Sequence, residues 1–309
     1  MKVYYGVDSF VPPSFPVVTT GTFDGVHSGH MVILNRIKEL ARQHNGETVV
    51  VSFDPHPRTV IHPHLDIRLL QTIDEKIVRL GKAGIDHFVI IPFTKEFSRT
   101  SSLSFVRDML IKALGTKLLV IGYDHQFGRN REGSIVDLEE FSVAYGFQIE
   151  QIEAQTFENI NISSTKIRKA LASGDFDTAN QFLGYPFTLT GTVIHGLKKG
   201  KEIGFPTANI DVTNPHKLIP AQGVYAVHVL VQGIEYKGML NIGLNPTVRS
   251  DKKQSVEVHL FDFDTDVYGE EIIINFIQRI RSEKKFDSLN ELKGQLAKDK
   301  RTSQQILSA

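Results

Sequence analysis

The ten residues Gly21–His30, GTFDGVHSGH, contain three glycines, one aspartate and two histidines, and they separate two segments of different periodicity. Pro16–Thr20, before them, is a short β-like run, and after them apolar residues recur with helical spacing from Met31 to Leu40. A strand that passes into a helix through a glycine-rich turn is typical of α/β domains, whose ligands bind at the carboxyl ends of parallel strands. The stretch therefore predicts an α/β domain with a ligand site at this junction.

The rest of the first half repeats the alternation of strand-like and helix-like segments. One helix is expected to begin near Thr72, where Thr72 and Glu75 have capping-box spacing, and another is expected to span Ser102 to Leu114. The further expected strands are apolar throughout and comprise Thr48–Phe53, His87–Ile91 and Lys117–Ile121. Such strands predict a parallel sheet covered by helices on both faces.

The pattern changes near Leu183–Pro186. From Phe187 to Arg281 the chain consists of short β-like runs separated by Gly, Asn and Pro, which predicts an all-β domain that forms a small barrel. One closing helix is expected from Ser288 to about Leu307, with Leu289, Leu292 and Leu296 on one side. We therefore expect two domains, at residues 1–184 and 185–309.

The composition narrows the classes of function. The chain has 309 residues with 35 basic and 35 acidic side chains, so no net field draws it to nucleic acid or to anionic membranes. No apolar run reaches the roughly 18 residues of a membrane span, and the first residues lack a secretory signal. The absence of cysteine excludes disulfides and thiolate chemistry. We expect a cytoplasmic protein with small-molecule partners and no nucleic-acid or membrane partner; homo-oligomerisation stays open.

The two histidines of the opening stretch are candidate catalytic groups. His27 and His30 are three residues apart at an expected helix start, where free backbone amides favour anions. The glycines allow a ligand to approach the backbone, and imidazoles could donate hydrogen bonds to phosphate oxygens. The arrangement favours a polyphosphate ligand over the plainer alternative, which is a glycine-rich turn with two surface histidines.

This stretch also resembles the H-x-G-H signature of nucleotidylyltransferases and class I aminoacyl-tRNA synthetases, and its G-T-F-D-G-V-H form is similar to prokaryotic FAD synthetases. The resemblance implies a Rossmann-like nucleotidylyltransferase domain in which His27 and His30 act on phosphate. It also implies nucleotide contacts by the neighbouring residues Gly21, Phe23, Asp24, Gly25 and Gly29.

Three further elements resemble the same family. Ile162–Arg168 matches its I-S-S-T-x-I-R element, which implies that Ser164, Thr165 and Arg168 hold ATP phosphates. By itself the segment would more readily be interpreted as a helix N-cap followed by a solvated arginine.

Phe53–Arg58 resembles an element near the nucleotide and the flavin, which implies a role for His56. Gly122–Gly128 resembles G-x-D-F-x-F-G and implies a ligand contact by Asp124, but His125 stands where the family has Phe. That departure would weaken binding of FMN or ATP if the aromatic ring packs on either ligand.

The second half resembles riboflavin kinases. Gly196–Asn209, GLKKGKEIGFPTAN, is similar to their signature, which implies a phosphate flap formed by Gly196, Gly200, Lys201 and Gly204. Lys201 replaces the Arg that is common there. The resemblance also implies that Thr207 and Asn209 contact nucleotide-bound Mg²⁺, an ion that prefers oxygen ligands. Without that context, the T-A-N sequence would be a turn beside a strand.

Val256–Phe261 fits the E-x-H-x-F pattern of that family, which implies that Glu257 orients the substrate hydroxyl and receives its proton. A glutamate at such a position is otherwise a solvent-facing strand residue. The stretch that follows resembles the C-terminal part of the family and implies flavin or nucleotide contacts by Arg281 and Phe286.

Together the motifs cover nearly the whole chain in the order found in bifunctional prokaryotic riboflavin kinase/FAD synthetases. The resemblance implies ATP-dependent phosphorylation of riboflavin to FMN and adenylylation of FMN to FAD, with Mg²⁺ and ATP. The alternatives are a class I tRNA synthetase, which the neutral charge balance disfavours, a non-enzymatic flavin-binding protein, and an enzyme that has lost one activity.

Overall fold

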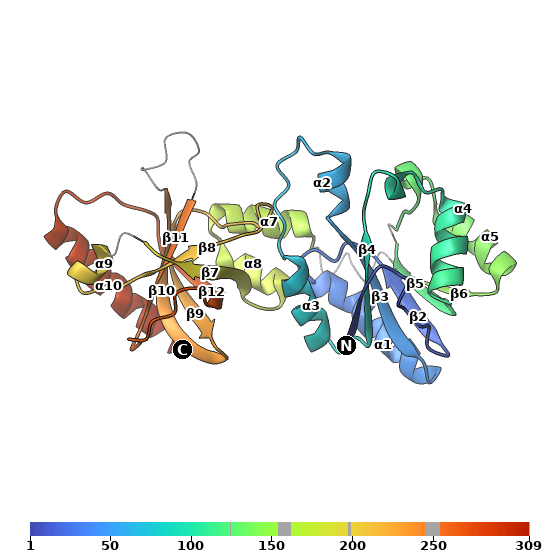
Figure 1. Cartoon of the computed structure of the whole chain (residues 1–309), viewed down its shortest axis with the longest axis horizontal. Coiled ribbons are helices and arrows are strands. Elements are labelled where there is room, and N and C mark those ends of the chain that lie inside the picture. The colour runs from blue at the N-terminus through green and yellow to red at the C-terminus, as the bar shows by residue number, and fades with distance from the viewer. Residues whose placement is uncertain (124, 154–161, 197–198, 245–253, 309) are drawn as a thin grey trace. The chain divides into compact units, whose positions relative to one another are not determined.

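The computed structural model describes residues 1–123, 125–153, 162–196, 199–244 and 254–308, except the side chains of Lys199 and Lys201. The chain forms two compact units, Met1–Ser163 and Ser164–Ala309, which are labelled by element in Figure 1. Each unit has its own sheet.

The first unit is built on a parallel sheet with the strand order β1-β4-β3-β2-β5-β6. Its strands are β1 (Lys2–Tyr5), β2 (Pro16–Thr20), β3 (Glu47–Asp54), β4 (His87–Pro92), β5 (Leu118–Gly122) and β6 (Gln148–Ile152). The central strands are buried along their length, as the continuous apolar runs predicted. The chain leaves β2 for β3 on one side, whereas β5 lies on the other side, so the end of β2 is the topological switch point of the sheet.

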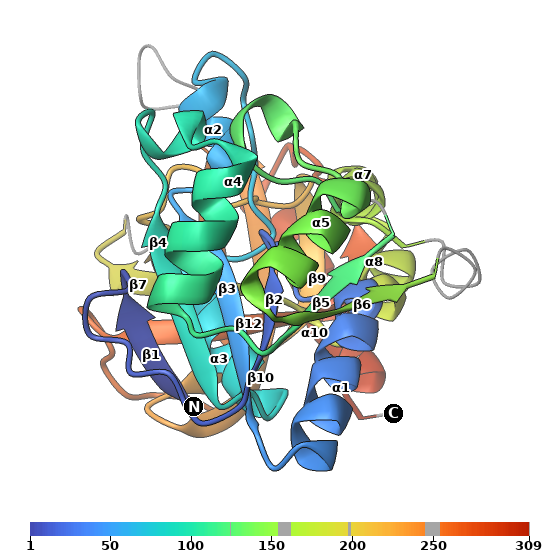
Figure 2. The same ribbon diagram turned by 90° about the vertical axis from the view of Figure 1, so that its right-hand side faces the viewer.

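Helices cover both faces of this sheet, as the sequence predicted (Figure 2). One face packs against α1 (Ser28–Gln43) and α3 (Ile73–Lys82), and the other against the π-helical segment η2 (Phe105–Ala113) and α5 (Ile135–Tyr145). The short helix α4 (Ser102–Ser104) directly precedes η2. The connections contain α2 (Pro57–Ile61), η1 (Phe97–Arg99) and η3 (Arg129–Arg131). The predicted capping box is present, since Thr72 and Glu75 each bond the backbone amide of the other.

The second unit contains a closed antiparallel barrel with the strand order β10-β11-β8-β7-β12-β9, which confirms the predicted all-β barrel. Its strands are β7 (Phe187–Ile194), β8 (Ala208–Asp211), β9 (Gly223–Val231), β10 (Ile234–Leu244), β11 (Gln254–Leu260) and β12 (Glu271–Arg281). A one-turn helix, α9 (Lys199–Glu202), lies in the connection from β7 to β8.

Two helices that precede the barrel in sequence pack against its strands. They are α7 (Ser164–Ser173) and α8 (Phe176–Leu183). The ring of Phe176 stacks on Phe276 with centroids 5.3 Å apart and meets Tyr225 edge-on at 5.1 Å. Asn180 donates to the Phe276 carbonyl (2.9 Å) and accepts from the Phe187 amide (2.8 Å). The helices therefore fold with the barrel, and the expected domain boundary at 184/185 stays a prediction.

The chain closes with α10 (Leu289–Ile306), whose N-cap is Ser288, the residue at which the closing helix was expected to begin. Leu296 packs with Met239 and Phe261 of the barrel. Leu289, which was expected on the same side, is 69% exposed because it lies in the first turn of the helix, outside that cluster. Among the residues described, no helix is both long and apolar enough to cross a membrane.

Candidate active sites

The predicted ligand elements of the first unit follow three adjacent strands. Gly21–His27 follows β2, His56 follows β3, and His125 follows β5. Because carboxyl ends of parallel strands meet at one edge of a sheet, the fold brings these three elements to the same edge, at the switch point. Asp124 lies outside the described residues.

The turn after β2 has an unusual backbone. Phe23, Gly25 and Val26 have φ of 45°, 91° and 36°, and Phe23 and Val26 are buried despite this strained conformation. A Cβ on Gly21 would lie 3.2 Å from the ring of Phe23. These positive φ values are unusual for a turn that joins a strand to a helix. Strained backbone of this kind is common where a protein contacts a ligand.

His27 and His30 lie face to face at the start of α1. Their rings are 3.7 Å apart and inclined by 16°, and Phe23 meets His30 edge-on at 5.2 Å. His27 is the N-cap of α1, and its Nδ1 accepts the His30 backbone amide at 3.3 Å. Its proton is therefore on Nε2. A Cβ on Gly29 would lie 3.1 Å from the His27 ring, so this glycine makes room for the imidazole.

His30 is a neutral hydrogen-bonding group with a vacant nitrogen. Burial, followed by the nearby charges of His27 and Lys76, holds the pKa of His30 well below its ordinary value. Its Nδ1 is buried without a hydrogen-bond partner in the described part of the chain. An unpaired buried nitrogen is costly, so this atom is suited to a ligand.

The buried side chains of Lys76 and Asp24 fix the turn after β2 to the rest of the first unit. The Lys76 ammonium donates to the Thr22 carbonyl (2.7 Å) and to Ser52 Oγ (3.2 Å). Burial lowers the pKa of Lys76 to about 8, although the carboxylates of Asp24 and Asp54 act in the opposite direction. The Asp24 carboxylate accepts the backbone amides of residues 70 and 71 at 3.0 to 3.2 Å. Asp24, predicted to contact the nucleotide, is thus also an anchor within the protein.

The sequence interpretation did not identify Lys76. A signal was available, because Lys76 lies between Ile73, Ile77 and Leu80 on the apolar stripe of α3. A cation at such a position must be paired by groups from the core side, and those groups proved to be at the end of β2 and β3.

The remaining predicted residues of this half lie at helix starts or beside aromatic rings. His56 is the N-cap of α2, where its Nδ1 accepts the Arg58 amide at 3.2 Å. The ring of His125 lies parallel to Phe127, with centroids 6.1 Å apart. The next predicted group, Ser164, Thr165 and Arg168, occupies the first turns of α7, in the second compact unit. Ser164 and Arg168 are four residues apart and share one face of this helix.

In the barrel, the predicted base and metal ligands come together. Glu257 on β11 lies opposite Asn209 of β8 and Asn241 of β10 in the strand register. The Thr207 hydroxyl donates to Glu257 Oε2 at 3.4 Å. The site thus offers a hydroxyl, an amide and a carboxylate, which are the oxygen donors that suit Mg²⁺ beside phosphate. No cluster of three or more His, Asp or Glu able to hold a metal ion occurs among the described residues.

The predicted flap glycines lie against this site. A Cβ on Gly196 would be 1.9 Å from Asn209 Nδ2, and one on Gly200 would be 2.3 Å from the Phe205 carbonyl. Gly204 has a φ of 84°. The approach of Gly200 to the Phe205 backbone requires glycine, and a side chain at Gly196 would displace the side-chain amide of Asn209. The side chain of Lys201 lies outside the described part of the structure.

Arg281 and Phe286 have protein partners. The Arg281 guanidinium donates to the buried Asp299 carboxylate of α10 from Nε (3.0 Å) and Nη2 (2.8 Å), and it lies 5.7 Å from the ring of Phe286. These contacts fix α10 against the end of β12. A ligand role for the two residues stays a prediction.

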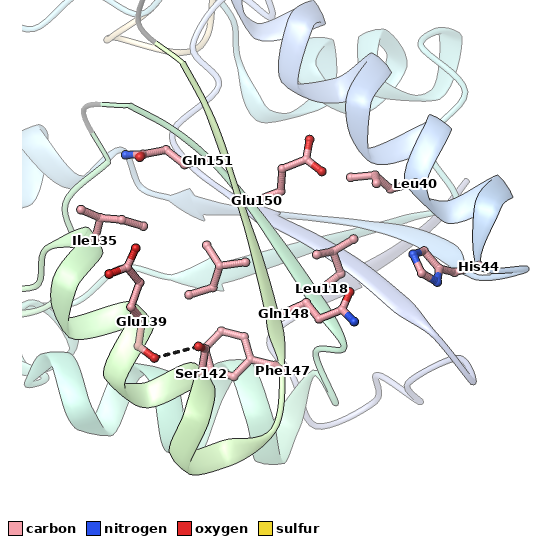
Figure 3. Close-up of a pocket in the computed structure, with 11 residues that line it drawn as sticks. Leu40, His44, Leu118, Ile135, Glu139, Ser142, Phe147, Gln148, Glu150 and Gln151 are labelled. Atoms are coloured by element: carbon pink, nitrogen blue, oxygen red, sulfur yellow. Dashed lines mark hydrogen bonds between the residues drawn. The ribbon is translucent and has the colours of Figure 1, made fainter.

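A cavity of about 490 Å³ lies beside the edge strand β6 (Figure 3). It is lined from α1, β5, α5 and β6, and none of the predicted site residues lines it. Its charged side chains, Glu139 and Glu150, are acidic, and Glu150 is paired with Arg36. Carboxylates at its surface do not suit a polyphosphate, so this cavity is not a candidate for the nucleotide.

Comparison with protein families assigns the two halves separately. Residues 13–166 match the family model of FAD synthetase, and residues 183–307 match that of riboflavin kinase. The first match includes His27, His30 and Ser164, the second includes Thr207 and Glu257, and Arg168 lies between the two.

Curated relatives match the chain over nearly its full length. A bifunctional riboflavin kinase/FMN adenylyltransferase from Listeria monocytogenes is 41% identical over 284 residues, which cover 92% of this chain and 90% of the relative. The protein of the same description from Escherichia coli K12 is 37% identical and covers 99% and 98%. Among solved structures, a protein from Streptococcus pneumoniae described as a macrolide-efflux protein superimposes with a TM-score of 0.86, at 29% identity and 98% coverage of both chains.

Proposed function

The chain belongs to the family of bifunctional riboflavin kinase/FMN adenylyltransferases, and from this premise we propose how its two units catalyse the two reactions. The barrel unit transfers the γ-phosphoryl group of ATP to riboflavin and gives FMN. The N-terminal unit joins AMP to FMN, gives FAD and releases pyrophosphate. The observation that supports this most directly is the nearly full-length similarity to relatives named for both activities. In addition, each half of the chain has a cluster of polar side chains at its matching motif, around His27 and His30 in the first unit and around Thr207 and Glu257 in the barrel.

In adenylyl transfer, the FMN phosphate attacks the α-phosphorus of ATP. This nucleophile is already anionic, so the reaction needs alignment and charge stabilisation rather than a general base. His27 presents Nε2–H, and neutral His30 offers its vacant nitrogen, so both imidazoles donate to phosphate oxygens at the start of α1. Arg168, with Ser164 and Thr165 at the start of α7, holds the pyrophosphate that leaves.

In the kinase reaction, Glu257 orients the ribityl hydroxyl and accepts its proton as the new P–O bond forms. Thr207 and Asn209, next to Glu257, would hold Mg²⁺ together with the ATP phosphates, and an ion bound there would offset negative charge on the transferred phosphoryl group. The flap places backbone amides over these phosphates.

The other predicted residues contact substrates in this proposal. Around ATP and FMN in the first unit they are Gly21, Phe23, Asp24, Gly25, Gly29, His56 and Asp124, and in the barrel they are Gly196, Gly200, Lys201, Gly204, Arg281 and Phe286. Its partners are the small molecules riboflavin, FMN and ATP. We place the protein in the cytoplasm on the basis of its likeness to the bacterial relatives, and the proposal leaves homo-oligomerisation open.

The test is to supply Mg²⁺ and ATP with riboflavin or with FMN and to separate the products by chromatography. We expect FAD from both flavins. His30→Ala should abolish FAD formation and preserve FMN formation, and Glu257→Ala should block riboflavin phosphorylation and preserve FMN adenylylation. The matched controls are His44→Ala and Glu271→Ala, two exposed positions outside both sites. Equal loss of both reactions in either site variant would contradict the two-site proposal.

A further inference from the structure

His259 lies beside the kinase site in an arrangement that its predicted motif does not explain. Alternate residues of a strand share a face, so His259 and Glu257 point to the same side of β11. The residue is 6% exposed. Its Nδ1 lies 2.7 Å from the carbonyl oxygen of Pro206, the residue before Thr207. A carbonyl can only accept, so Nδ1 carries the proton and donates it.

This hydrogen bond lies just beyond the last paired residues of strands β8 and β11. The register between β8 and β11 pairs Asn209 with Glu257 and Ala208 with Val258, and β8 begins at Ala208. Thr207 therefore lies one residue beyond the ladder. Its own bond to Glu257 is long, at 3.4 Å, and contributes little to its position. The shorter bond from His259 holds the backbone immediately before Thr207.

Aromatic neighbours fix the plane of the His259 ring. Phe205 meets it edge-on at 5.5 Å, and Phe261 does so at 5.6 Å. The other ring nitrogen, Nε2, is buried and has no hydrogen-bond partner among the described residues. A phenylalanine would fill the same space without an unpaired polar atom, which costs about 1–3 kcal/mol. A purely space-filling role would therefore be served better by an apolar ring.

We propose that His259 is a positioning residue of the riboflavin kinase site, which holds the Pro206 carbonyl so that Thr207 and Asn209 face Glu257. The proposal rests on the kinase function assigned above to the barrel. His259 itself contacts neither ATP nor riboflavin in this role. It acts through the Phe205–Asn209 segment, so its loss should appear first in the use of Mg²⁺ and ATP.

The test compares His259→Phe, which keeps the ring and removes the donor, with His259→Asn, whose side-chain amide places a donor near the position of Nδ1. Riboflavin phosphorylation is measured over a range of ATP at saturating Mg²⁺ and over a range of Mg²⁺ at fixed ATP. We expect His259→Phe to raise the KM for ATP and the half-saturating Mg²⁺ concentration and to lower kcat/KM by about 10- to 100-fold, the usual effect of losing one buried hydrogen bond. His259→Asn should recover kcat/KM to within about 3-fold of the wild type if the donor is restored.

Two controls separate this role from general damage. His216→Phe alters an exposed histidine of the same unit and should leave phosphorylation unchanged. FAD formation from added FMN, measured on the same preparations, should stay at the wild-type rate. Unchanged phosphorylation by His259→Phe would overturn the proposal, and so would equal losses in the Phe and Asn variants that parallel a fall in melting temperature. If His259→Phe does not fold, the proposal is tested with His259→Asn alone. A fall in kcat/KM for riboflavin phosphorylation of more than about 10-fold in folded His259→Asn would then overturn it. A wild-type protein that leaves riboflavin unphosphorylated would instead refute the kinase function.

Discussion

We predict that the difference in the free energy of unfolding between the wild type and the variant Lys76→Met changes with pH, in favour of the wild type at high pH. Lys76 is 6% exposed, and its ammonium donates to the Thr22 carbonyl and to Ser52 Oγ beneath the Gly21–His30 turn. Methionine has a similar length and no charge. The comparison therefore isolates the consequence of placing one cation in the core of the first unit.

The magnitude follows from the pKa of Lys76, which burial lowers from 10.5 to about 8. Below pH 8 the lysine is protonated in both the folded and the unfolded chain. Between pH 8 and 10.5 the unfolded chain binds more protons, so the free energy of unfolding of the wild type rises with pH. At about 1.4 kcal/mol per pH unit, this stabilisation reaches about 3 kcal/mol, and most of it is gained by pH 10. Lys76→Met cannot gain it.

The measurement is urea unfolding of both proteins at pH 7 and pH 10, followed by circular dichroism because the chain has no tryptophan. The pKa of His30, which the Lys76 charge lowers further, lies well below this pH range, so its titration does not enter the difference between pH 7 and pH 10. We expect the wild type to gain about 2–3 kcal/mol on the variant between the two pH values. Lys82→Met, at an exposed position of the same helix, should show the same difference from wild type at both. A difference for Lys76→Met that is independent of pH would refute the reasoning, because it would mean that burial does not disfavour the charged lysine.

Three further predictions concern single contacts. Gly196→Ala places a Cβ 1.9 Å from Asn209 Nδ2, so it should displace the amide and lower riboflavin phosphorylation at least about 10-fold while FAD formation from FMN continues; normal phosphorylation would show that Asn209 is not needed in this position. Asp299→Asn removes the charge that pairs the Arg281 guanidinium and should lower the free energy of unfolding by about 3 kcal/mol in urea titrations, whereas a change below about 1 kcal/mol would mean that the pair adds little. His125→Phe restores the family's aromatic residue and should lower the KM for FMN in FAD formation by about 2- to 10-fold, and an unchanged KM for both FMN and ATP would place this side chain away from the ligands.

The sequence predicted the elements whose periodicity is strong. Pro16–Thr20 and the helix after Ser28 begin at the expected residues, and the capping box marked the start of α3. The barrel followed from its short β-like runs. The helix expected over Ser102–Leu114 has the predicted extent, but most of it is π-helical, a difference in hydrogen bonding that spacing of apolar residues does not specify.

The elements that escaped prediction have weak patterns. The edge strands β1 and β6 are short and partly exposed, so they lack the continuous apolar run of a central strand. Among site residues, motif resemblance drew attention to groups that face a ligand. It could not indicate the contacts of Lys76 with the Thr22 carbonyl and of His259 with the Pro206 carbonyl, because the two partners in each contact come from distant parts of the chain.

Helices α7 and α8 have a consequence for the modularity of the polypeptide. Arg168, the proposed pyrophosphate clamp of FAD formation, lies on α7, and the aromatic face of α8 is buried against Phe276 and Tyr225 of the barrel. A fragment that ends at Ser163 would lack the clamp, and one that ends at Gly184 would retain it on helices stripped of their apolar support. We therefore predict that a gene split at either point would impair FAD formation, because it would remove the proposed clamp or the barrel contacts that support its helices, while the barrel itself would stay whole.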